Sequence, residues 1–75
     1  MNHDLSLKTR RAVAKYGQDN CLEAHRMHFN QGEGARTIAA TISCTNIRTT
    51  HDANAAIDAG RELHWAAKRS VQPSF

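Results

Sequence analysis

Apolar residues recur at intervals of three and four in four stretches of the chain, which is the spacing of one face of an α-helix. No stretch alternates apolar and polar residues for long enough to form a strand. The first helix is predicted from about Ser6 to Tyr16, with Gly17 as a stop signal after its last turn. Its apolar side is predicted to consist of Leu7, Val13, Ala14 and Tyr16.

The second helix is predicted to begin after Asp19 or Asn20, because Asn20 and Glu23 have the spacing of a capping box. Its apolar positions are Cys21, Leu22, His25 and Phe29. It is expected to end in residues 30–34, Asn-Gln-Gly-Glu-Gly, which form the clearest turn signal in the sequence.

The third helix is predicted to be short, from Ala35 to about Ser43. Its core side carries Ile38, Ala39 and Ile42. Residues 44–50 are rich in β-branched and polar residues, which are poor helix formers. The sequence leaves open whether they form a loop or the start of a displaced recognition helix.

A long fourth helix is predicted to follow, capped by Thr49 or Thr50 and reaching roughly Arg69. Small and apolar residues recur along it at steps of three and four, which marks a buried side. That side is predicted to contain Ala53, Ala56, Ile57, Gly60, Leu63, His64 and Ala67.

Four helices without a strand predict an all-α fold, a small helical bundle. The 75 residues are enough for one domain, residues 1–75, with 1–5 and 70–75 expected to be loose tails. A core of this size is thin and leaves little room for the layered active site of an enzyme. We therefore expect a binding protein and not an enzyme.

Charge, cysteine content and the distribution of apolar residues indicate possible partners and the cellular location. Ten Lys and Arg against seven Asp and Glu give a net charge of +3, a mild excess that is compatible with phosphate binding. Two cysteines do not form the disulfide framework of a secreted protein, and no segment has the apolar run of a signal peptide or of a membrane span. We expect a cytoplasmic protein without membrane contact.

Residues 35–60 have the pattern of a helix-turn-helix, in which the second helix lies in the major groove and presents its first side chains to base edges. Ala39 is the small residue where the two helices cross, and Ile42 follows three positions later. Ser43 stands where a glycine is usual, and the Gly-Glu-Gly turn of residues 32–34 lies directly before the segment.

Residues 54–61, Asn-Ala-Ala-Ile-Asp-Ala-Gly-Arg, resemble the recognition helix of the Cro repressors of lambdoid phages, which reads Asn-Lys-Ala-Ile-His-Ala-Gly-Arg; six of the eight positions are identical. The resemblance implies a repressor-like transcriptional regulator of phage or plasmid origin. It implies that Asn54 contacts a base and that Thr50 and His51 lie at the groove-facing start of the helix.

The chain departs from that family at several points. Ala55 replaces a base-contacting lysine of the family. The interval from Ala39 to Ile57 is longer than in the family, so the turn must be expanded. After Arg61 the family continues into strands that form its dimer, whereas this chain is predicted to stay helical.

The predicted function is therefore sequence-specific binding of double-stranded DNA. Asn can pair with adenine, Arg with guanine and Thr with several bases. The predicted reading residues are Arg36, Arg48, Thr49, Thr50, His51, Asn54 and Arg61. The predicted phosphate anchors, which set position without reading sequence, are Lys8, Arg10, Arg11 and Lys15. If the recognition helix is displaced, Thr45, Asn46 and Arg48 would read bases instead of Asn54.

A homodimer is expected, because specific affinity requires two such units spaced about 34 Å apart. Trp65 is the candidate dimer contact, since a partly exposed Trp on a final helix often anchors an interface. The rival prediction is a small protein that binds and inhibits another protein through its helical surface, without DNA contact. A structural or assembly accessory is a third alternative.

No metal or cofactor is predicted. Cys21, His25 and His28 share one helical face, and zinc binds such ligands, with Cys44, His51 or His64 as a fourth. However, the sequence contains no paired Cys-x-x-Cys knuckle. Cys21 is therefore expected to be a small buried apolar residue.

Overall fold

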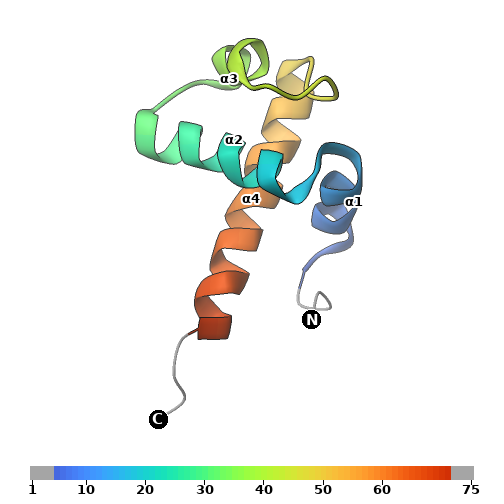
Figure 1. Cartoon of the computed structure of the whole chain (residues 1–75), viewed down its shortest axis with the longest axis vertical. Coiled ribbons are helices and arrows are strands. Elements are labelled where there is room, and N and C mark those ends of the chain that lie inside the picture. The colour runs from blue at the N-terminus through green and yellow to red at the C-terminus, as the bar shows by residue number, and fades with distance from the viewer. Residues whose placement is uncertain (1–4, 72–75) are drawn as a thin grey trace.

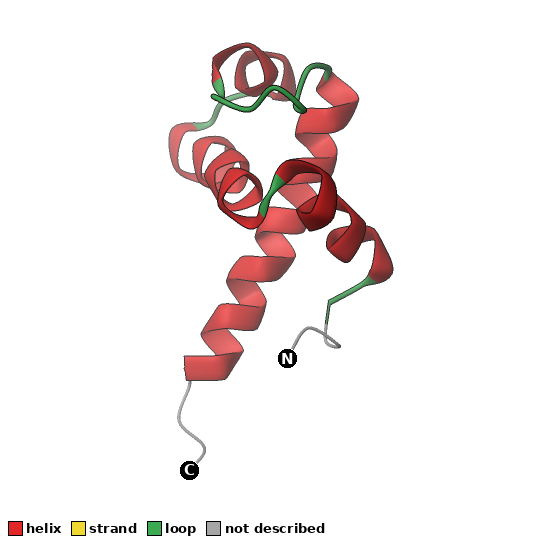
Figure 2. Ribbon diagram, turned by 45° about the vertical axis from the view of Figure 1, so that its right-hand side comes forward, coloured by secondary structure: helices red, strands yellow, loops and turns green. Residues whose placement is uncertain are grey.

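The computed structural model describes residues 5–71, which form four helices and no strand: α1 (Leu7–Tyr16), α2 (Gln18–Gln31), α3 (Ala35–Thr41) and α4 (Thr50–Val71) (Figure 1). The predicted all-α fold is confirmed. The long helix α4 is central, and each of the other three helices packs against it (Figure 2). The C-terminal part of α4 extends beyond the other helices (Figure 1).

The centre of the core is the crossing of α2 and α4. A Cβ atom on Gly60 would lie 2.1 Å from the carbonyl oxygen of Cys21, so α4 can carry no side chain at this point. Small residues surround the crossing, and Cys21, Ala24, Ala53 and Ala56 are each 0% exposed. The predicted burial of Cys21, Ala53 and Ala56 is confirmed.

A single residue, Gly17, separates α1 from α2. Its φ of +93° lies in the region that favours glycine, so the chain turns within one residue and α1 ends there as predicted. α2 then begins at Gln18, before the predicted start after Asp19 or Asn20. The predicted capping box is wrong, because the Asn20 amide donates to a carbonyl of α1 at 2.8 Å and Glu23 forms an ion pair with the arginine three residues later.

The connection from α3 to α4 is a loop of residues 42–49. α3 ends at Thr41, before the predicted end at Ser43, because Ile42 is already extended. The loop is longer than the three- to four-residue turn of a standard helix-turn-helix, and Ile47, which is 1% exposed, anchors it to the core. Residues 44–49 are therefore a loop, and no displaced recognition helix begins there.

Several predictions of burial are wrong. Phe29 is 76% exposed, whereas the buried residues of α2 are Cys21, Ala24 and Met27. In α1, Thr9 and Ala12 occupy buried positions. The other predicted core residues that the structure leaves exposed are Leu7, Ala14, His64 and Ala67.

The predicted chain ends also differ from the structure. Leu5, expected in a loose tail, is buried at 6% exposure, and α4 continues past Arg69 to Val71. The remainder of the two predicted tails, residues 1–4 and 72–75, lies outside the described residues. None of the helices within the described range is long and apolar enough to cross a membrane.

Candidate nucleic-acid interface

Helix α1 lies antiparallel to α4, held at both ends. At its start, the Ser6 hydroxyl donates to Glu62 Oε1 at 3.0 Å. At its end, the Tyr16 hydroxyl donates to Asp52 Oδ1 at 2.8 Å. The basic residues of α1 consequently lie beside the N-terminal part of α4, where the reading residues are predicted.

The start of α4 is fixed by a reciprocal cap. Thr49 Oγ1 accepts from the backbone N–H of Asp52 at 3.1 Å, and Asp52 Oδ2 accepts from the N–H groups of Arg48 and Thr49 at 3.2 and 3.3 Å. Thr49 is thus the cap, one of the two predicted threonines. Lys15 Nζ lies 3.8 Å from Asp52 Oδ1, so the cap is also joined to α1.

The charge of this cap decides how α4 can bind an anion. The Tyr16 hydroxyl and, next, the Arg48 backbone N–H lower the pKa of Asp52 to about 2. Burial and then the bond to Asp52 raise the pKa of Tyr16 to about 12. At neutral pH Asp52 is therefore a carboxylate in the first turn of α4, where its negative charge opposes binding of a phosphate.

An exposed stripe runs along α4 at alternating steps of three and four; we call it the α4 stripe, and its members are His51, Asn54, Asp58, Arg61 and Trp65. His51 and Asn54 make no side-chain hydrogen bond or ion pair with another residue between 5 and 68, the range in which side chains are described. Arg61 is partly committed, because its Nη2 lies 3.5 Å from Asp58 Oδ1. The N-terminal part of the stripe is thus the part available to a partner.

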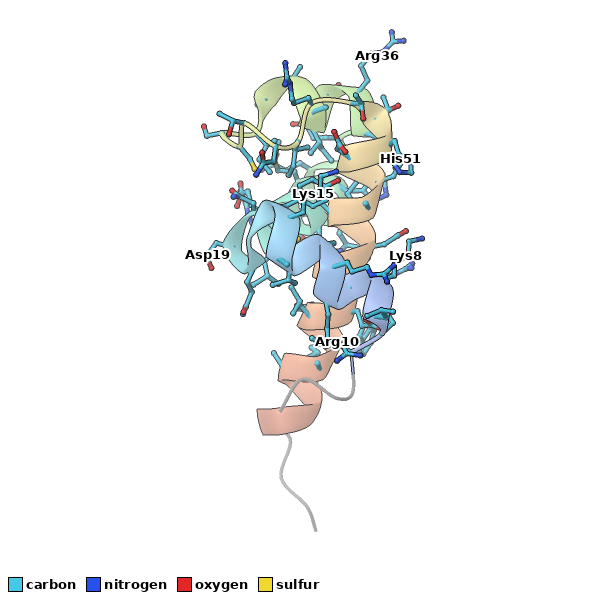
Figure 3. All side chains as sticks on the ribbon, turned by 90° about the vertical axis from the view of Figure 1, so that its right-hand side faces the viewer. Lys8, Arg10, Lys15, Asp19, Arg36 and His51 are labelled. Carbon is cyan, nitrogen blue, oxygen red and sulfur yellow. The ribbon has the colours of Figure 1, made fainter. Side chains whose placement is uncertain are left out.

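The other predicted reading residues divide into three groups. Arg48 and Thr50 are exposed beside His51, and their side chains have no partner within the described part of the chain. The Thr49 hydroxyl is occupied by the cap. Arg36 is exposed on α3, and Figure 3 shows it on the same side of the molecule as His51 and Lys8, whereas Asp19 points to the opposite side.

The four predicted phosphate anchors do not share one face. Lys8 lines a groove of about 540 Å³ together with Arg61 and Trp65, so it lies beside the α4 stripe. Arg11 and Lys15 follow Lys8 at helical spacing on the same face of α1. Arg10 instead lines a different groove, with Leu63 and Val13.

Sequence reasoning missed the acidic residues of this surface. Asp52 joins α1 to α4, and the Thr-x-x-Asp spacing of residues 49–52 was the signal that could have revealed its capping role. Asp58 and Glu62 line the groove beside Lys8. These carboxylates reduce the attraction of this part of the surface for phosphate.

The zinc alternative finds no support in the geometry. The Cys21 thiol is buried, 3.9 Å from the Ala12 carbonyl oxygen, and burial raises its pKa to about 11. His28 Nδ1 lies 2.9 Å from the Glu33 carbonyl oxygen. Within residues 5–71, no three His, Cys, Asp or Glu side chains are arranged to hold a metal ion.

Comparison with known proteins adds no relative. No protein-family model, no curated protein sequence and no solved structure matches this chain.

Proposed function

We propose that the protein binds double-stranded DNA in a sequence-specific manner through the N-terminal part of α4 and regulates transcription as a repressor-like homodimer. One observation carries the proposal. Arg48, His51 and Asn54 are exposed together where α4 begins, and their side chains have no partner among the described residues. Uncommitted side chains of these types are those that read base edges.

The surroundings of these residues support the same function. A helix about 10–12 Å wide fits the major groove, which is about 12 Å wide. Lys8, Arg11 and Lys15 form a basic row beside α4 that suits the flanking phosphates. The side chain of Asp52 is only 15% exposed, so most of this carboxylate is shielded from a bound DNA.

The test is selection from a pool of random duplex DNA, followed by sequencing, for the wild type and for Arg48→Ala and Asn54→Ala. The wild type is expected to enrich a motif with two-fold symmetry. Asn54→Ala is expected to relax one position of each half-site, at a cost of about 1–3 kcal/mol in discrimination. Gln31→Ala, which changes an exposed amide at the end of α2, is the control and should enrich the wild-type motif.

Two outcomes would contradict the proposal. One is the absence of enrichment and of salt-dependent binding even at about 50 mM salt. The other is an unchanged motif in both Asn54→Ala and Arg48→Ala, which would remove the N-terminal part of α4 from the reading surface. The first outcome would favour the rival function, binding and inhibition of another protein.

A further inference from the structure

Two histidines lie against each other next to the crossing of α2 and α4. His25 comes one turn after Cys21 in α2, and His64 comes one turn after Gly60 in α4. Their ring centres are 5.6 Å apart, with the ring planes tilted by 39°. The His25 ring also stacks on Phe29, with centres 5.6 Å apart and an angle of 20° between the planes. His25 therefore contacts one ring from each helix.

The close approach of the two helices fixes the base of the His25 side chain. A Cβ atom on Gly60 would lie 2.6 Å from the Cβ of His25, so this part of α2 lies directly against the backbone of α4. The His25 Cβ can move away from α4 only if the two helices separate. A change in the charge of His25 consequently acts on the crossing itself.

One nitrogen of the His25 ring is buried without a hydrogen-bond partner. Among the described side chains, His25 Nδ1 is the only buried nitrogen or oxygen that forms no hydrogen bond. A neutral imidazole has one N–H, and with that proton on Nε2 the buried Nδ1 needs no acceptor. The protonated ring has an N–H at both nitrogens. Protonation therefore creates a buried donor without an acceptor, which destabilises the folded state.

The charged groups around His25 also oppose its protonation. Burial is the largest cause of the lowered pKa of His25, followed by the charges of His64 and Arg61 on α4 and of His28 on α2. Arg26 lines the same groove as His25 and is paired with a carboxylate three residues earlier in α2. In the described part of α1 and α3, no charged group shifts the pKa of His25. A proton on His25 is thus bound without a compensating carboxylate.

We propose that His25 and His64 form a pH-sensitive contact, which destabilises the crossing of α2 and α4 when His25 binds a proton in mild acid. The direction of the effect follows from proton affinity. Because the pKa of His25 is lowered in the folded protein, the unfolded chain binds this proton more readily, and stability is lost as the pH falls below 6.5, the ordinary value. Above that pH the ring is neutral in both states and contributes no dependence on pH.

The first test follows the ring signals of the histidines by NMR as a function of pH, in the folded protein and in the protein unfolded by urea. His25 is expected to titrate at a lower pH in the folded protein. His64→Gln removes the neighbouring imidazole and should raise the midpoint of His25 toward the unfolded value. A folded midpoint of His25 at or above the unfolded one, or no change in His64→Gln, would overturn the proposal.

The second test measures urea unfolding between pH 7.5 and 5.5, where carboxylates remain charged. Over this range the unfolding constant of the wild type is expected to rise about three- to tenfold more than that of His25→Phe, which keeps a ring beside Phe29 and cannot titrate. His51→Phe makes the same exchange at an exposed histidine of α4 and should keep the wild-type dependence on pH.

Equal dependence on pH in the wild type and His25→Phe, or the same reduction in His51→Phe, would contradict the proposal. Circular dichroism at pH 7.5 checks that both variants fold, and the titration of the wild type tests the proposal without any variant. Neither measurement uses DNA, so the outcome is independent of the proposed function.

Discussion

At the residue scale, Gly60 controls the closest approach in the core. The Cβ of Gly60→Ala would lie 2.1 Å from the Cys21 carbonyl oxygen, which belongs to the backbone and cannot rotate away. The two helices must then separate, and we expect a loss of about 1–3 kcal/mol in the free energy of unfolding, as for other overpacked cores. Urea unfolding of the variant and the wild type measures the difference.

Gly34→Ala is the control for this experiment. Nothing lies within 4 Å of a Cβ on Gly34, and its φ of −80° is open to any residue. Because Gly34 is the N-cap of α3, where Gly is favoured over Ala, we expect a loss below about 1 kcal/mol, smaller than that of Gly60→Ala. Equal stability of Gly60→Ala and wild type would show that α2 and α4 are farther apart than described.

The shifted pKa values of Asp52 and of the buried Tyr16, which share a hydrogen bond, make stability depend on pH at both extremes. The pKa of Asp52 is about 2 against an ordinary 3.8, so its contribution is present above about pH 4 and is lost as the pH falls through 2. The pKa of Tyr16 is about 12 against 10, so its contribution is present below pH 10 and is lost as the pH rises through 12.

We expect Tyr16→Phe to reduce the dependence of stability on pH in both the acidic and the basic range. The substitution keeps the buried ring and removes the hydroxyl that donates to Asp52. Thermal unfolding midpoints at pH 2.5, 6 and 11 measure this for both proteins. The midpoint of the wild type should fall more than that of Tyr16→Phe between pH 6 and each extreme. Identical pH profiles would exclude the hydrogen bond as their source.

Whether the sequence predicts the burial of a single residue depends on whether the residue type or a tertiary contact determines that burial. Burial of Cys21 was predictable because a free cysteine is commonly buried. Exposure of Phe29 was not, because a helix with several apolar positions has no unique core face until a second helix selects one. In α2 the residues closest to Gly60 are Cys21 and His25, and the other buried residues of the helix are Ala24 and Met27, not Phe29.

At the element scale, the sequence predicted a helix end correctly where a single residue type determines that end locally. The end of α1 followed from Gly17 and the start of α4 from a threonine cap. The start of α2 did not follow from Asn20, because its side chain bonds back to α1. The length of the loop at residues 42–49 also escaped prediction, since its fixed point is a tertiary contact of Ile47 with the core.

The two adjacent threonines at the start of α4 provide a test at the same scale. Thr49→Ala removes the hydroxyl that caps the Asp52 N–H, and we expect a loss of about 1 kcal/mol in unfolding free energy. Thr50→Ala changes the next residue, which lies inside the helix, and its effect should be within about 0.5 kcal/mol. A larger effect of Thr50→Ala in urea unfolding would move the cap by one residue.

At the scale of the whole molecule, the surface depends on how α1 docks. The sequence predicted a basic α1 and a polar start of α4, but it could not predict that they lie side by side. That arrangement depends on contacts between residues far apart in the chain, Ser6 with Glu62 and Tyr16 with Asp52. The same docking divides the α1 cations, because it turns Lys8 toward Arg61 and Arg10 toward Leu63.

This division predicts different roles for two cations on one helix. If DNA lies along the α4 stripe, Lys8→Gln removes a phosphate contact and should reduce the slope of log affinity against log salt by about 1, with a similar loss of affinity for every DNA sequence. Arg10→Gln, on the other side of α1, should leave the slope unchanged. Fluorescence anisotropy with labelled duplex DNA over a series of salt concentrations measures both. A smaller slope in Arg10→Gln than in Lys8→Gln would mean that DNA binds on the opposite side of α1, away from Asn54.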